Sequence, residues 1–237
     1  MESPQQKLEI DPSQPLSIDE AMHLATDLHL AGHHEDAYKI YMRVLDAVPN
    51  HPDALHFMGV LAHDQGCDED AIRLMSYSVA LVPDHAGFRN NFGNLLLDNE
   101  RFEEAEQEYR HALSLDPDRP DALNNHGVLC KGLGRYEEAE RSLLRAIELA
   151  PDFIDARNNL ARLYVRLGRF EESLEQAREA LDRAPKDSRT HEMRGYVYTK
   201  LGRFDEAAKI YREWLEAEPD NPKALHHLAA CTAQGVP

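Results

Sequence analysis

Residues 120–153 read PDALNNHGVLCKGLGRYEEAERSLLRAIELAPDF, and variants of this stretch follow one another along most of the chain. The repetition is marked by a proline every 34 residues, at Pro49, Pro83, Pro117, Pro151, Pro185 and Pro219. A fixed period between about 20 and 50 residues indicates a repeat architecture, and 34 residues is a length typical of a helix–turn–helix unit. The spacing therefore predicts a stack of helical hairpins, in which each unit packs on its neighbours.

The register of the repeat assigns a role to several positions. With each proline at position 32, the chain divides into six units: 18–51, 52–85, 86–119, 120–153, 154–187 and 188–221. Positions 8 and 20 hold only glycine, alanine or serine, which lets the two helices of a hairpin approach closely. Position 15 is glycine in five units, as expected for a turn with positive φ. Glu100 is the exception, and we expect the adjacent Asn99 to take the left-handed conformation there.

Acidic residues also follow the repeat. They occupy positions 18 and 19 of all six units, as in Glu137 and Glu138. These positions begin the second helix, where the helix dipole favours negative charge. Asp84, Asp118, Asp152 and Asp220 directly follow four of the prolines, and we expect them to cap the next first helix. Much of the net charge of −17 is therefore assigned to solvated helix starts rather than to an acidic recognition patch.

Composition disfavours several classes of function. The acidic balance opposes nucleic-acid binding, which needs a basic surface. No apolar run is long enough to span a membrane, and the polar N-terminus lacks a signal-peptide core, so a cytoplasmic location is expected.

Cys67, Cys130 and Cys231 have no paired spacing and are predicted to be free thiols. His29 and His63, at equivalent repeat positions, are expected to lie near each other as polar lining. No catalytic motif is present, and we predict a non-enzyme without cofactor or metal.

The register closely resembles that of the tetratricopeptide repeat (TPR) family, including Tyr41, Tyr109 and Tyr211 at position 24. The resemblance covers residues 18–221 and implies an all-α, right-handed superhelical solenoid of six hairpins. Residues 1–17 are interpreted as a flexible arm, and residues 222–237 as a capping helix with a short tail. The array is similar to bacterial ones of the O-GlcNAc-transferase type. Its ending, HHLAACTAQGVP, resembles the junction of TPR–methyltransferase fusions.

The pair Asn-Asn recurs at positions 5 and 6 of three successive units. In the family, position 6 faces a concave groove, so the resemblance implies a ladder of Asn91, Asn125 and Asn159. An asparagine amide both donates and accepts hydrogen bonds, and can therefore pair with the backbone of an extended peptide. The predicted peptide-binding residues that flank this ladder are Asn90, Asn94, Asn124, Asn158, Lys131, Arg162 and Arg166. The alternative is that asparagine is simply common at this position of the family and grips no ligand.

The groove positions of the last three units carry a net charge of +2, from five bases and three acids, within an acidic chain. Such a local excess steers an acidic peptide or protein segment by electrostatic focusing. Binding of chaperone tails is disfavoured, because position 5 never holds lysine. Two other functions stay open: recruitment of substrate to a modifying enzyme, either a methyltransferase or a glycosyltransferase, and self-association through the ends of the solenoid.

Overall fold

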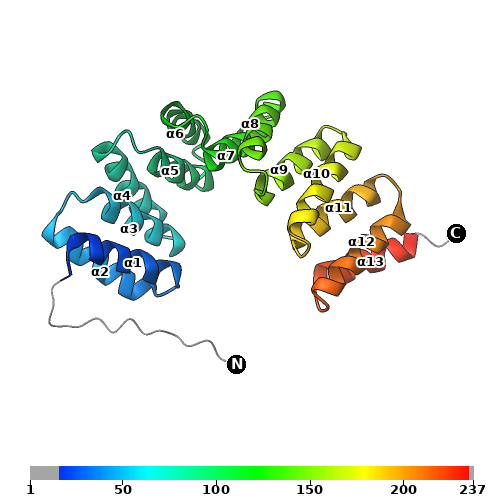
Figure 1. Ribbon diagram of the computed structural model, residues 1–237, viewed down its shortest axis with the longest axis horizontal. Helices are drawn as coiled ribbons and strands as arrows, with labels where there is room; N and C mark the ends of the chain where they lie inside the picture. The colour runs from blue at the N-terminus through cyan, green and yellow to red at the C-terminus, as the bar shows by residue number, and fades with distance from the viewer. Residues whose placement is uncertain (1–15, 235–237) are drawn as a thin grey trace. The chain divides into compact units, whose positions relative to one another are not determined.

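In the computed structural model, residues 16–234 are described, and within this range the chain forms thirteen α-helices and no strand (Figure 1). Odd-numbered helices have 13 residues, and even-numbered helices before α13 have 14. Their bounds are α1 Ile18–Leu30, α2 His34–Ala47, α3 Pro52–Asp64, α4 Asp68–Leu81, α5 Ala86–Asp98, α6 Phe102–Leu115, α7 Pro120–Gly132, α8 Tyr136–Leu149, α9 Ile154–Arg166, α10 Phe170–Arg183, α11 Ser188–Lys200, α12 Phe204–Ala217 and α13 Pro222–Gln234. The all-α class is thereby confirmed.

The turn inside each hairpin has one residue in the left-handed conformation. Five of these are the predicted glycines, with φ between 70° and 80°. In the turn between α5 and α6, however, Glu100 itself has a φ of 58°, so the expectation that Asn99 would take this role is wrong. The backbone N–H of Glu100 donates to the carbonyl of Leu97, and Arg101 donates to Leu96. These bonds hold the same turn without the glycine.

Helix starts differ from the sequence prediction in one respect. Acidic residues do fill the first turns of the second helices, such as Glu137 and Glu138 in α8. The aspartates that follow the prolines, however, do not cap the first helices, because two residues form a turn before the helix begins. The cap is the residue one position later: His51 accepts from the N–H of Ala54, and Asp187 from that of Thr190.

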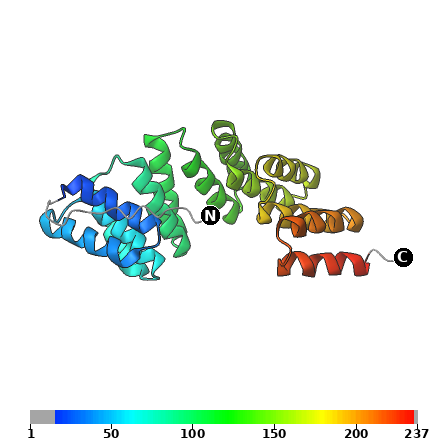
Figure 2. The same ribbon diagram turned by 60° about the horizontal axis from the view of Figure 1, so that its bottom comes forward.

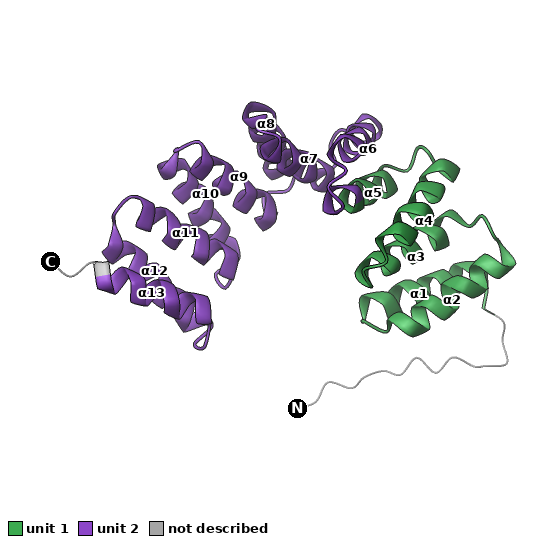
Figure 3. Ribbon diagram, turned by 180° about the vertical axis from the view of Figure 1, so that it is seen from behind, with its two compact units in different colours: residues 1–95 green, residues 96–237 purple. Residues whose placement is uncertain are grey.

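The chain divides into two compact units, residues 1–95 and residues 96–237 (Figure 3). In the first unit, α1 packs on α2 and α3 on α4, around buried Tyr41, Val44 and Leu61. Ala25 and Ala37, at positions 8 and 20, are fully buried. The small residues at these positions therefore do bring the two helices of a hairpin together.

In the second unit, α7 packs on α8, α9 on α10 and α11 on α12. Cys130, Leu143 and Tyr164 belong to one of its cores. Helix α13 lies along α12 (Figure 2), where Ala224 and Cys231 pack against the buried Trp214. This helix thus covers the last hairpin, as predicted. Residues 1–15 of the predicted arm and residues 235–237 lie outside the described residues. Among the helices of residues 16–234, none is long and apolar enough to cross a membrane.

Candidate functional site

The first helices of neighbouring hairpins lie side by side in the second unit, where α7 contacts α9 and α9 contacts α11. Residues at positions 5, 6, 9, 12 and 13 of these helices therefore come close to their counterparts in the next hairpin. We call the surface made by Asn125 and Lys131 of α7 with Asn159, Arg162 and Arg166 of α9 the first-helix face. All five are half-buried or exposed, and all were predicted binding residues.

Three asparagines of this unit form a continuous hydrogen-bonded chain. The Nδ2 of Asn159 donates to the Oδ1 of Asn124 at 2.9 Å, and the Nδ2 of Asn124 donates to the Oδ1 of Asn125 at 3.1 Å. Asn124 is buried, with 7% of its surface exposed. It therefore ties α7 to α9 and fixes the orientation of the two more exposed amides.

Asn158 has a different role from the one expected of a flanking contact. It is 4% exposed, its Nδ2 donates to Asp187 at 3.0 Å, and its Oδ1 lies 2.8 Å from the hydroxyl of Thr190. Because Asp187 caps α11, this asparagine connects α9 to the start of the next first helix. Position 5 in this unit is thus engaged in contacts between hairpins.

The remaining predicted asparagines lie on α5, whose first ten residues belong to the first unit. Asn91 is exposed, and its amide lies 3.1 Å from the Nε2 of His56 on α3. Asn90 is buried, and Asn94 is half-buried. The contact between Asn91 and His56 spans 35 residues, as does the bond between Asn159 and Asn124. Because Asn91 and the pair Asn125 and Asn159 belong to different units, the three-residue ladder stays a prediction.

The cations of the first-helix face have no acidic partner among residues 16–234. Within the described residues, Lys131, Arg162 and Arg166 form no ion pair with a carboxylate, whereas Arg189 on α11 is 2.6 Å from Asp155. Arg166 instead donates to the hydroxyl of Tyr136 at 2.7 Å. Three uncompensated positive charges therefore meet where α7 faces α9.

The pKa of Lys131 reflects this arrangement. Burial lowers the pKa, and the positive charges of Arg162 and Arg166 lower it further. Like charges held together repel, so an anion placed between them is favoured on electrostatic grounds. The arrangement suits a carboxylate ligand, which arginine binds through two parallel hydrogen bonds.

Two hollows of the surface lie away from the asparagines. One, of about 240 Å³, is in the first unit and is lined by Tyr38, Met58 and Cys67 among others. The other, of about 260 Å³, is in the second unit and includes Arg178, Arg194 and Tyr198 in its lining. The second hollow was not anticipated from the sequence, because its residues come from α10, α11 and the turn before α12.

Two histidines of the first unit lie against aspartates. The Nε2 of His29 lies 3.0 Å from Asp64, and the Nδ1 of His63 lies 2.7 Å from Asp68. His56 is fully buried against Phe88, with ring centroids 3.9 Å apart. These contacts could not be predicted from the sequence, because they depend on the direction of each side chain and not on its position in the repeat.

Two family models described as tetratricopeptide repeat match the chain. One matches residues 158–222, and the other matches residues 84–152 and 122–186. Together the matches span residues 84–222, which is 139 of 237 residues. No curated protein matched the sequence.

Solved structures with similar folds include PilW, described as a widely conserved type IV pilus biogenesis factor, with a TM-score of 0.82 and 18% identity over 92% of this chain and all (100%) of that one. YrrB, described as a TPR protein with an unusual peptide-binding site, has a TM-score of 0.59 and 19% identity over 78% of this chain and 96% of its own. A chain of the APC/C heterotetramer Cut9–Hcn1 has a TM-score of 0.78 at 15% identity. That match covers 91% of this chain but 43% of the other, so this chain spans less than half its length.

These likenesses confirm the predicted all-α repeat fold. The family-model matches, which together span more than half of the chain, show that it belongs to the tetratricopeptide repeat family.

Proposed function

We propose that this chain is a non-catalytic protein-interaction module that binds an extended, acidic segment of a partner protein on its first-helix face. The observation that carries the proposal is the cluster of Lys131, Arg162 and Arg166 beside the asparagine chain, with no carboxylate partner in the part of the chain that the structure describes. Proteins of this family generally bind proteins or peptides. The peptide-binding site described for YrrB is consistent with such a role for the fold.

Helical periodicity supports a shared binding surface on α9. Asn159, Arg162 and Arg166 are three and seven residues apart, so all three lie on one side of the helix. The Oδ1 of Asn159 has no partner within the described residues, which leaves it available to accept from a peptide N–H. The amide would grip the peptide backbone while the guanidinium groups bind acidic side chains.

The spacing of the repeats also suits an extended ligand. Packed helices lie about 8–10 Å apart, and an extended chain advances about 3.3 Å per residue. Successive position-6 asparagines would therefore contact about every third residue of the peptide. We propose the same backbone contact for Asn91 of the first unit, with Asn90 and Asn94 on the same helix.

Selection of linear peptides tests this proposal. A library of random displayed peptides is panned on the full chain, and one enriched peptide is then titrated against variants by fluorescence anisotropy. We expect enrichment of aspartate and glutamate. We also expect the double reversal R162E/R166E to weaken binding by at least about tenfold, or 1.4 kcal/mol, because two attractions become repulsions.

The matched control is R141E/R212E, which makes the same change in net charge on exposed arginines of the second helices α8 and α12. It should bind almost as tightly as the wild type. Equal losses in the two double variants, or enrichment without acidic bias, would contradict the proposal. The triple variant N91A/N125A/N159A separately tests the ladder, which predicts loss of binding with little change in stability.

Two alternatives have specific support. The likeness of the C-terminal residues to a methyltransferase junction, and of the asparagines to those of O-GlcNAc-transferase arrays, favours a substrate-recruiting module of a modifying enzyme. The reading frame beyond Pro237 tests it, and a stop codon there would exclude a C-terminal fusion. Self-association through the array ends is favoured by Leu225 of α13, whose surface is 50% exposed. A single monomeric species across a wide concentration range in sedimentation would exclude that alternative.

The proposal also includes the division of the chain into an N-terminal arm, six repeat units and a capping helix. It includes a cytoplasmic location as well.

A further inference from the structure

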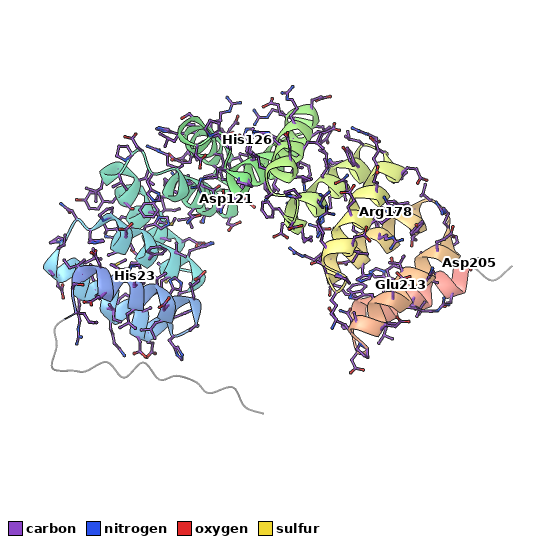
Figure 4. The ribbon with its side chains drawn as sticks, in the orientation of Figure 1. His23, Asp121, His126, Arg178, Asp205 and Glu213 are labelled. Atoms are coloured by element: carbon purple, nitrogen blue, oxygen red, sulfur yellow. The ribbon has the colours of Figure 1, made fainter. Side chains whose placement is uncertain are left out.

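A cluster of three potential metal ligands lies in the second unit, away from the first-helix face. It consists of His126 and Cys130 on α7 and Glu138 on α8, and the ligand atoms all lie within 4.8 Å of one another. His126 is labelled in Figure 4, on α7, which packs against α8. We propose that these residues bind a divalent transition metal of the zinc class, with His126, Cys130 and Glu138 as ligands and a fourth position for water.

The geometry of the His–Cys pair fits tetrahedral coordination. The Nε2 of His126 lies 3.5 Å from the Sγ of Cys130. With Zn–S of about 2.3 Å and Zn–N of about 2.05 Å, a tetrahedral angle separates the two ligand atoms by about 3.6 Å. The two residues are four positions apart on one helix, which places their side chains on the same face. The pair is therefore at its metal-bound spacing without movement of the backbone.

The other imidazole nitrogen is already held. The Nδ1 of His126 lies 3.0 Å from the hydroxyl oxygen of Ser142 on α8. Metal-bound histidines regularly use their second nitrogen in such a hydrogen bond, which fixes the ring and its tautomer. Ser142 thus holds the imidazole beside Cys130, whose Sγ lies 3.5 Å from the Nε2 and 3.9 Å from the Nδ1, and it is a positioning residue of the site.

Two of the three ligands attract a divalent ion, because a thiolate and the Glu138 carboxylate supply two negative charges. Arg135 donates to the Sγ of Cys130 at 3.5 Å, which favours the thiolate, and it pairs with Glu106 at 2.8 Å. Arg135 shares this one carboxylate with Arg110, so one positive charge remains beside the ligands. Arg110 is bound by Glu106 at 2.7 Å and lies 3.9 Å from Glu138, which leaves Glu138 only loosely held.

The exposure of the three ligands sets the path by which a metal enters, and their chemical type sets which metal is preferred. Cys130 is fully buried and His126 is 9% exposed, whereas the side chain of Glu138 is 35% exposed. A metal enters from the Glu138 side and leaves its open position there. On binding, the S–H bond of Cys130 breaks, a metal–sulfur bond forms and the proton passes to solvent. A thiolate with an imidazole favours zinc or cobalt over magnesium or calcium.

Titration of the full chain with Co²⁺ under a phosphine reductant tests the site. A cobalt–thiolate bond gives a charge-transfer band in the near ultraviolet, which no other ligand type in this chain would produce. We expect the band at one equivalent in the wild type and in Cys67→Ser, whose exposed thiol serves as the matched control. The band should be absent in Cys130→Ser, and Zn²⁺ should displace cobalt.

Glu138→Gln provides a variant at a half-exposed position that leaves the packing intact. It should keep the band but weaken Co²⁺ affinity by more than about tenfold, since even outer-shell partners of a metal contribute that much. The proposal is overturned if the wild type shows no thiolate band, if the band survives in Cys130→Ser, or if Glu138→Gln binds as tightly as the wild type. Far-UV circular dichroism confirms folding of each variant. If Cys130→Ser does not fold, Glu138→Gln decides the outcome.

Discussion

The close approach of the two helices in a hairpin makes one substitution decisive, Gly195→Ala. Gly195 lies in α11 and faces Tyr211 of α12. A Cβ atom at this position would lie 2.4 Å from both the Cε1 and the Cζ of the Tyr211 ring and 2.8 Å from its hydroxyl oxygen. The ring is 2% exposed and belongs to the core that includes Trp214 and Cys231, so it has little space into which to move.

Two opposing terms set the size of the effect. Replacing glycine by alanine inside a helix normally stabilises it by about 1 kcal/mol. Overpacking a core usually costs about 1–3 kcal/mol, and a rigid ring at this distance places the cost near the upper end. The net expectation is a loss of about 2 kcal/mol in the free energy of unfolding, or about 4–8 °C in melting temperature for a chain of this size.

Urea unfolding followed by far-UV circular dichroism measures the difference. Gly132→Ala is the control, because Gly132 ends α7 and an added Cβ would meet nothing within 4 Å. It should gain about 0.5–1 kcal/mol. Gly59→Ala should fall between the two, since the atom in its way is the Cγ of the flexible Met75. A Gly195→Ala variant as stable as Gly132→Ala would contradict the close approach of α11 and α12 at this position.

Further substitutions test the turn, the buried histidine and the asparagine contacts. Glu100→Gly should raise the free energy of unfolding by about 1 kcal/mol, because it relieves a left-handed non-glycine residue, and Gly134→Ala should lower it by a similar amount in the same urea assay. Burial, with a smaller contribution from His85, lowers the pKa of His56 from 6.5 to about 3. Between these values the unfolded chain binds a proton that the folded chain does not, so stability falls with falling pH by up to about 1.4 kcal/mol per pH unit. His56→Asn should flatten this slope in melting curves recorded from pH 7 to pH 4. Asn158→Ala should cost about 1–3 kcal/mol in urea unfolding, because the buried Thr190 and the half-buried Asp187 each lose a hydrogen-bonding partner.

The fold could be predicted from the sequence because each repeat position carries a constraint that any copy must satisfy. Glycine at the turn, small residues at positions 8 and 20, and acids at the start of the second helix each reflect backbone geometry or the helix dipole. Six copies of the same constraints leave one consistent register. Glu100 shows the limit of this reasoning, since the surrounding hairpin holds it in a conformation that its side chain disfavours.

The candidate site could be predicted only in part. The register does place Asn125, Asn159, Arg162 and Arg166 on neighbouring first helices, because position along a helix fixes direction. It does not reveal that Asn124 would bond to Asn159, since that depends on side-chain rotamers across the contact. The spacing of 35 residues between bonded partners was the available signal.

Binding of an acidic segment to the first-helix face can be observed by nuclear magnetic resonance of the bound complex. An enriched acidic peptide is added to isotope-labelled chain, and the side-chain N–H signals of asparagine and arginine are followed. We expect the signals of Asn125, Asn159 and Arg162 to shift and that of Arg178 to stay in place. Shifts confined to the hollow lined by Arg178 and Arg194, with Asn159 unchanged, would contradict it.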